Sequence, residues 1–181
     1  MKRNKHQKGV GLIEVLVALL LLAIGVLGYS ILQLRAVDAS SEALSRSQGM
    51  LILRGLAENM RANADAQDSY PRLVRTYTNI TTSPNAPTPS CFNPNASACT
   101  PVQMADYDAF MAARSAFEIG MNITMDDCPG VGSAPMQRQC LFIAWGDTNL
   151  SATATVADVS ECMSVTGVYE NRSHCLMMEA Y

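Results

Sequence analysis

Six cysteines are the residues of this chain whose type and spacing most clearly predict chemistry. They are Cys91, Cys99, Cys128, Cys140, Cys162 and Cys175, all in the second half of the 181-residue sequence. An even number of cysteines predicts disulfides where the segment lies in an oxidising compartment. A structural zinc site is disfavoured, because no C-x-x-C pair occurs and His174 is the only histidine beyond residue 9. Fifteen pairings are possible, and pairing in succession, which closes the shortest loops, is our working prediction.

Side chains for acid–base or nucleophilic catalysis are sparse. Asp126 and Asp127 could serve as a general acid or as calcium ligands, but adjacent aspartates ahead of Pro129 and Gly130 are more typical of a solvated turn. His174 is expected to be a surface or strand residue. The sequence contains no glycine-rich phosphate loop, nucleophile elbow or metal-binding helix motif. We therefore predict no catalytic residue, no metal site and no cofactor, and we expect that the chain is not an enzyme.

One acidic residue, Glu14, interrupts a long apolar stretch near the start of the chain. The stretch is GVGLIEVLVALLLLAIGVLG, residues 9–28, and no charged residue occurs from Val15 to Leu32. It is long enough to span roughly 30 Å of hydrocarbon. The basic residues ahead of it, Lys2, Arg3, Lys5 and Lys8, predict that the N-terminus stays in the cytoplasm. A carboxylate at the centre of a membrane helix costs on the order of 2.5–3.5 kcal/mol, and less near an end, so Glu14 predicts a cationic partner.

Cleavage after Gly9 would supply that cation, because Val10 would carry a free amino group one helical turn before Glu14 and could meet the Glu14 of a neighbouring subunit. The segment KGVGLIEVLVALLLLAIGVLG resembles the class III signal of type IV prepilins. The resemblance implies that the prepilin peptidase cleaves after Gly9 and methylates Val10, and it assigns Glu14 to assembly. The family most often has Phe and Thr where this chain has Val10 and Gly11. An ordinary secretory signal would end in a small-x-small site, and none follows Leu27.

The apolar stretch is expected to continue as one long helix. Residues 33–68 keep helical spacing of their apolar side chains, at Leu34, Val37, Leu44, Leu51, Leu53, Leu56 and Met60. No proline occurs before Pro71, so we predict helix to about Ala64. Four glycines, Gly25, Gly28, Gly49 and Gly55, indicate either bending or close helix packing. The predicted parts are a removed leader at 1–9, a transmembrane part at 10–34, an amphipathic outer half at 35–68 and a disulfide-bonded periplasmic head at 69–181.

The head is predicted to contain a second helix and a small antiparallel sheet. Residues 69–100 are rich in Pro, Ser, Thr and Asn and predict a surface loop without regular elements longer than a few residues. A capping box at Thr100 and Gln103 opens the helix, whose apolar side is expected to carry Met104, Tyr107, Phe110 and Phe117. Alternation over 119–125 predicts a strand, followed by strands at 139–145, 160–168 and 174–181. Trp145 is expected in the core. The predicted fold class is α+β, pilin-like, with the long N-terminal helix packed on this sheet.

Charge excludes nucleic acid as an expected partner. All four cations of residues 1–9 would leave with the leader, which changes the formal net charge from -3 to -7, because 9 Arg then face 16 Asp and Glu. Phosphate contacts need clustered Lys or Arg, and the shortened chain has no lysine. At 181 residues the chain is expected to hold one modest core outside the membrane.

The runs VLVALLLLAIG and GVLG resemble minor pilins of the PilV, or pilus modification, type, and CTPVQMADYDAF adds a looser likeness. This implies a subunit that helps to prime type IV pilus assembly and enters the filament near its tip. The implied partners are the prepilin peptidase, other minor pilins, the major pilin and the inner membrane, with the head in the periplasm before incorporation into the pilus. Two alternatives stay open: a minor pseudopilin of type II secretion, which shares this N-terminal run, and a signal-anchored periplasmic binding domain.

Overall fold

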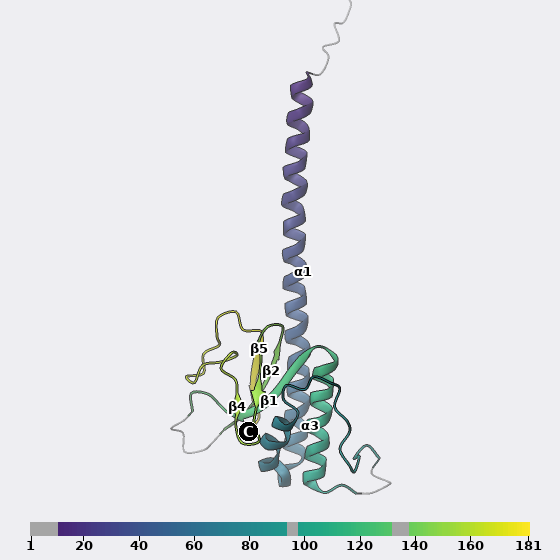
Figure 1. The fold of residues 1–181 in the computed structure, drawn as a ribbon, viewed down its shortest axis with the longest axis vertical. Helices are drawn as coiled ribbons and strands as arrows, with labels where there is room; N and C mark the ends of the chain where they lie inside the picture. The colour runs from purple at the N-terminus through teal and green to yellow at the C-terminus, as the bar shows by residue number, and fades with distance from the viewer. Residues whose placement is uncertain (1–10, 94–97, 132–137) are drawn as a thin grey trace, which may run out of the picture. The chain divides into compact units, whose positions relative to one another are not determined.

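The computed structural model describes residues 11–93, 98–131 and 138–181, and it forms two compact units. The first, Met1–Leu44, is called here the helical unit, and the second, Ser45–Tyr181, the head unit. Each unit is described on its own. The first helix, α1, spans Leu12–Ala62 and so contributes residues to both (Figure 1). It ends two residues before the predicted Ala64, which confirms one helix uninterrupted by proline.

In the helical unit, α1 exposes nearly every apolar side chain. Leu34, Val37 and Leu44 are 58–66% exposed, so helical spacing there does not mark a face buried within this chain. In the head unit the same helix buries Leu53, Leu56 and Met60 but leaves Leu51 exposed. Within the head unit, the last turns of α1 therefore have one buried and one exposed face.

Gly49 lies where α1 meets the sheet of the head unit. A Cβ atom built on it would lie 3.2 Å from Cγ2 of Ile143, so the close-packing interpretation holds at this glycine. A Cβ atom built on Gly25, Gly28 or Gly55 would have no described atom within 4 Å.

The prediction of a loop over residues 69–100 is wrong at its start. A 3-10 helix, η1, spans Ala64–Ser69, and an α-helix, α2, spans Tyr70–Thr76. Pro71 lies in the first turn of α2, where its missing N–H removes no helical hydrogen bond. Tyr70, Leu73 and Val74 are buried, so packing in the head unit stabilises a helix that composition alone disfavours.

The helix α3 spans Pro101–Glu118 and opens with the predicted capping box, formed by Thr100 and Gln103. Its buried face differs from the prediction. It is built mainly from small side chains, Ala105, Ala109, Ala113 and Ala116 together with Phe110. Met104, Tyr107 and Phe117 lie at the margins and are only half-buried. The alanines let α3 approach its neighbours closely, which large side chains at those positions would prevent.

The sheet has three antiparallel strands in the order β1-β2-β5. They span Met121–Asp127, Gln139–Trp145 and Cys175–Glu179. The register pairs Ile123 with Ile143 and Ile143 with Leu176. Three of the four predicted strands are thus confirmed, although Ile119 caps α3 rather than joining β1. The strand predicted at 160–168 is absent from the described structure, where only Met163 and Tyr169 form an isolated bridge. A separate two-stranded ribbon pairs β3, Ser151–Ala152, with β4, Ala157–Asp158.

Both faces of β2 are buried, and this divides the core of the head unit into two layers. Leu141, Ile143 and Trp145 face a cluster that also contains Leu53 of α1, Val74 of α2 and alanines of α3. Phe142 and Ala144 face a second cluster with Leu150, Met163 and four half-cystines. Figure 1 shows α3 on one side of the strands and the yellow-green loops of the C-terminal segment on the other. That second layer explains why β2 does not alternate apolar and polar residues.

Candidate assembly site and disulfide-bonded head

Glu14 lies in the first turn of α1, and its backbone N–H donates to the carbonyl oxygen of Gly11 at 2.9 Å. The side chain is exposed, as are the neighbouring Leu12 and Ile13, at 80% and 71%. The N-terminal end of a helix favours a carboxylate, because unpaired N–H groups give that end a partial positive charge. The next cation along the chain is Arg35, about 30 Å further along a helix with a rise of 1.5 Å per residue. Glu14 therefore has no cation of its own helix within reach among the described residues.

One helix in the described part of the chain, α1, is long and apolar enough to cross a membrane. None of its apolar membrane-length stretch is buried within the protein. Side chains such as Leu20, Leu21 and Leu22 are 59–63% exposed. Burying them in lipid or against other helices is favourable by roughly 25 cal/mol per Å² of apolar surface. The predicted cleavage and methylation positions, Gly9 and Val10, lie outside the described residues.

All six cysteines form disulfides, and they pair in succession. The pairs are Cys91 with Cys99, Cys128 with Cys140, and Cys162 with Cys175. These pairs close loops with sequence separations of 8, 12 and 13 residues. This is the shortest-loop arrangement among the fifteen.

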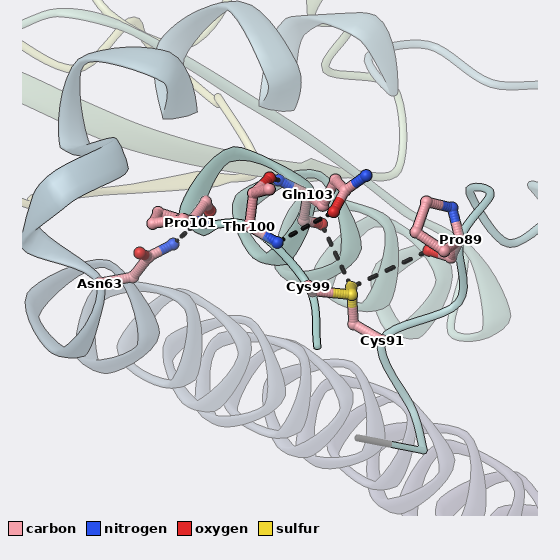
Figure 2. Close-up of a disulfide and its surroundings, with 7 residues drawn as sticks. All are labelled: Asn63, Pro89, Cys91, Cys99, Thr100, Pro101 and Gln103. Carbon is pink, nitrogen blue, oxygen red and sulfur yellow. Dashed lines mark hydrogen bonds between the residues drawn. A yellow bond between two sulfur atoms is a disulfide. The ribbon is translucent and has the colours of Figure 1, made fainter. Parts of the chain in front are cut away.

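The Cys91–Cys99 disulfide holds the end of the proline-rich segment against the start of α3 (Figure 2). Sγ of Cys91 lies 3.6 Å from the carbonyl oxygen of Gln103; a bridged sulfur carries no hydrogen, so this is a packing contact. On the same stretch, Asn63 donates from Nδ2 to the carbonyl oxygen of Pro101 at 2.8 Å. The end of α1, the bridged segment and the start of α3 are thus joined.

The other two disulfides stabilise the C-terminal layer of the head unit. Cys128 follows β1 and Cys140 lies in β2, so their bridge closes the turn between these strands. Cys162 and Cys175 are 0% and 3% exposed and pack with Phe142 and Leu150. The segment between β4 and β5 has little regular structure, so this bridge and its apolar contacts supply the order that a strand would otherwise give.

A polar network between α1, α2 and α3 was not predicted. The Tyr70 hydroxyl donates to Oδ2 of Asp108 at 2.7 Å, and Asn59 donates to Oδ1 of the same carboxylate at 3.3 Å. Asn63 donates to the Tyr70 oxygen at 3.2 Å. Burial raises the pKa of Asp108 above its ordinary value, although the Tyr70 hydrogen bond opposes that rise. Burial and the Asp108 carboxylate raise the pKa of Tyr70, so its proton stays in place and the network acts as a fixed link between helices.

Asp126 does not lie in a solvated turn, contrary to the prediction. It belongs to β1, and Arg75 of α2 donates from Nη1 to its Oδ1 at 3.3 Å. The Arg75 and Asp126 side chains are only 10% and 16% exposed. The backbone N–H of Ala157 donates to the other carboxylate oxygen. Asp127 is the last residue of β1, and its carboxylate accepts a hydrogen bond from the side-chain amide of Gln139. Both acids therefore have partners that fix their position.

Trp145 is 9% exposed and packs in the main core, which confirms its predicted place there. Its ring lies 6.4 Å from that of His174, centroid to centroid. His174 is half-buried and precedes β5, and its backbone N–H donates to the Thr148 hydroxyl at 2.8 Å. Within residues 11–93, 98–131 and 138–181, no three His, Cys, Asp or Glu side chains group as metal ligands would.

Comparison with known families gives two matches that follow one another along the chain. The family model described as a prokaryotic N-terminal methylation motif matches residues 4–30. The family model described as type IV pilin Tt1218 matches residues 31–110. No curated protein matches the chain, and no solved structure does.

The two matches cover the apolar helix with Glu14, the rest of α1, and the segment through most of α3. The architecture agrees, because a long N-terminal helix packs its last turns on a small antiparallel sheet within the head unit. The chain is a type IV pilin subunit, a member of a family of structural subunits and not of enzymes.

Proposed function

We propose that this pilin is a minor pilin of the PilV type, which helps to prime pilus assembly and enters the filament near its tip. The observation that carries the proposal is Glu14, an acid on an exposed apolar helix that offers it no cation within reach from residue 11 onward. In a plain membrane anchor such an acid is a net cost in the bilayer, whereas a bundle of subunits can neutralise it between chains. The resemblance of residues 8–34 to PilV-type subunits and the cysteine-rich head unit support a specialised role over that of the bulk pilin.

The same proposal divides the chain by compartment. Residues 1–9 form the leader that the prepilin peptidase removes, residues 10–34 cross the inner membrane, and the outer half of the helix at 35–68 leads into a periplasmic head at 69–181. Three disulfides support the periplasmic assignment, because disulfides persist in oxidising compartments and are rare in the cytosol. The subunit then moves from the membrane into the pilus beside other minor pilins and the major pilin.

Processing supplies a direct test of the N-terminal assignment. The mature chain is expected to begin at Val10 with a methylated amino group, because Gly9 precedes the apolar run and Glu14 follows at the spacing of the class III signal. Intact-mass measurement and N-terminal sequencing of protein from wild-type cells and from cells lacking the peptidase check this. A mature end beyond Leu27, or a leader retained in wild-type cells, contradicts the class III assignment.

Deletion of the gene tests the priming role. We expect the yield of surface pili to fall to a small fraction of wild type and to recover when the wild-type gene is restored. Quantitative mass spectrometry of sheared pili should find this subunit far below the major pilin, because a tip subunit occupies one end of the filament whereas the major pilin repeats along its whole length. Loss of type II secretion with normal piliation would instead assign the chain to a pseudopilus. Normal piliation together with normal secretion would favour a signal-anchored binding domain.

A further inference from the structure

A groove of about 560 Å³ opens on the head unit between the end of β1, β4 and the segment that follows β4. We call it the β1–β4 groove. Its apolar lining comes from Pro129, Val156, Val159, Met163 and Val165. Of these, Val156 and Val165 are 56% and 89% exposed. Exposed apolar side chains that gather around one concavity on a folded unit mark an interaction surface.

The wall of this groove is held in a defined shape. Gly130 and Gly167 both have a φ of +83°, a conformation that glycine adopts without strain. The backbone N–H of Gly130 donates to the carbonyl oxygen of Val165 at 2.9 Å. A Cβ atom on Gly130 would lie 2.9 Å from the carbonyl oxygen of Thr166, so only glycine fits this approach. The disulfides at Cys128 and Cys162 anchor the two approaching segments, and a preformed wall lowers the entropy cost of binding.

The charge of the groove is uniformly negative. Four carboxylates line it, those of Asp126, Asp127, Asp158 and Glu170, and no Lys or Arg is among its lining residues. The guanidinium of Arg75 forms an ion pair with one of these carboxylates, that of Asp126. Hydrogen bonds from Ser160 lower the pKa of Asp158, so that exposed carboxylate stays ionised at neutral pH. Among the described residues, Asp127, Asp158 and Glu170 have no cationic partner, so about three negative charges lie beside the apolar lining of the groove.

We propose that the β1–β4 groove binds an exposed segment of a neighbouring, more basic pilin subunit, in which Arg or Lys alternates with aliphatic residues. The aliphatic side chains would cover Val156 and Val165, and the cations would lie against Asp158 and Glu170. A second copy of this chain fits poorly, because nine Arg against sixteen acids leave the processed chain at -7 and two copies repel. The inference rests on the proposed function for the identity of the partner, and the chemistry of the groove is testable without it.

The test uses the full mature protein in detergent micelles. The probe is Val-Arg-Val-Arg-Val-amide with fluorescein attached at its N-terminus, and the signal of protein-free micelles is subtracted. Fluorescence anisotropy is expected to show binding that weakens as salt rises. The double variant Asp158→Asn with Glu170→Gln should weaken it about tenfold, as expected for two surface charge contacts. The matched control, Asp65→Asn with Glu118→Gln, removes two exposed carboxylates elsewhere on the head unit and should bind as wild type. Val165→Ser should also weaken binding, while Val102→Ser on α3 should not.

Three outcomes would overturn the proposal: no binding of the probe above that of micelles alone, equal loss in the matched control, or equal binding of a Val-Glu-Val-Glu-Val peptide. A complementation assay separates this result from the priming role. If deletion abolishes piliation but the groove variant restores it fully, the groove is not a subunit contact and the priming role stands. If deletion changes nothing, the priming role fails whatever the peptide shows.

Discussion

Replacing Glu14 with valine is expected to abolish incorporation of the subunit into pili while leaving its membrane insertion intact. The change removes a carboxylate from a helix whose apolar side chains are exposed over residues 12–44. Insertion becomes easier by up to roughly 2.5–3.5 kcal/mol, because no charge then has to enter the hydrocarbon. Assembly is expected to fail, because we propose that this carboxylate pairs with the methylated amine of Val10 in a neighbouring subunit. The two properties should therefore separate.

The measurement compares membrane fractions with sheared pili in a deletion strain that expresses the variant at wild-type abundance. Asp38→Val is the matched control, since Asp38 is an exposed acid on the same helix but lies beyond the uncharged run from Val15 to Leu32. It should assemble normally. Glu14→Asp keeps the charge and should retain part of the function. Full piliation with Glu14→Val would show that the acid has no role in assembly.

Removal of the Cys162–Cys175 disulfide is expected to destabilise the head unit more than removal of Cys91–Cys99. Releasing a loop of 13 residues costs about 3 kcal/mol in the chain-entropy picture, and one of 8 residues costs only about 0.4 kcal/mol less. Burial makes the larger difference. Cys162 and Cys175 lie inside an apolar cluster with Phe142, so their truncation also leaves a cavity. Cys91 is also buried but belongs to neither apolar cluster, and Cys99 is only half-buried at the edge of α3.

Thermal unfolding of the double alanine variants checks this. Alanine is preferred to serine, because two buried hydroxyls without partners would add their own cost. We expect Cys162→Ala with Cys175→Ala to lower Tm by roughly 10 °C, and Cys91→Ala with Cys99→Ala to lower it less. Thiol counting on the denatured wild type should find no free cysteine. Equal shifts in the two variants, or two or more free thiols in the wild type, would contradict the account.

Some features were predictable because one short segment carries the whole signal. The capping box at Thr100 and Gln103 satisfies its hydrogen bonds within four residues, so the start of α3 needs no distant partner. The length of α1 follows from helix-forming residues without proline over fifty positions. The alternation over 119–125 predicts β1 and the apolar run over 174–181 predicts β5, and both predictions start and end within two residues of the strands in the structure.

Other features were missed because packing overrode local preference. Proline-rich composition predicted a loop after Ser69, yet Tyr70, Leu73 and Val74 are buried and hold α2 in place. Large side chains were expected on the buried face of α3. That face instead consists mainly of alanines, because the elements packed against α3 lie too close to it for larger side chains. The segment 160–168 has the composition of a strand. Its structure is nevertheless irregular. The disulfide between Cys162 and Cys175 holds the segment in place, and its backbone forms only the isolated bridge between Met163 and Tyr169.

The sequence by itself determined the anchor, the position of Glu14, the class of the fold and the oxidised state expected of six cysteines, because each depends on composition or on neighbours along the chain. Only the tertiary structure decided which polar groups meet. The links between Tyr70 and Asp108, and between Arg75 and Asp126, join residues 38 and 51 positions apart. The β1–β4 groove likewise exists because two glycine turns approach each other, Gly130 and Gly167. Contacts at such separations depend on how the helices and strands pack, and no local pattern records that packing.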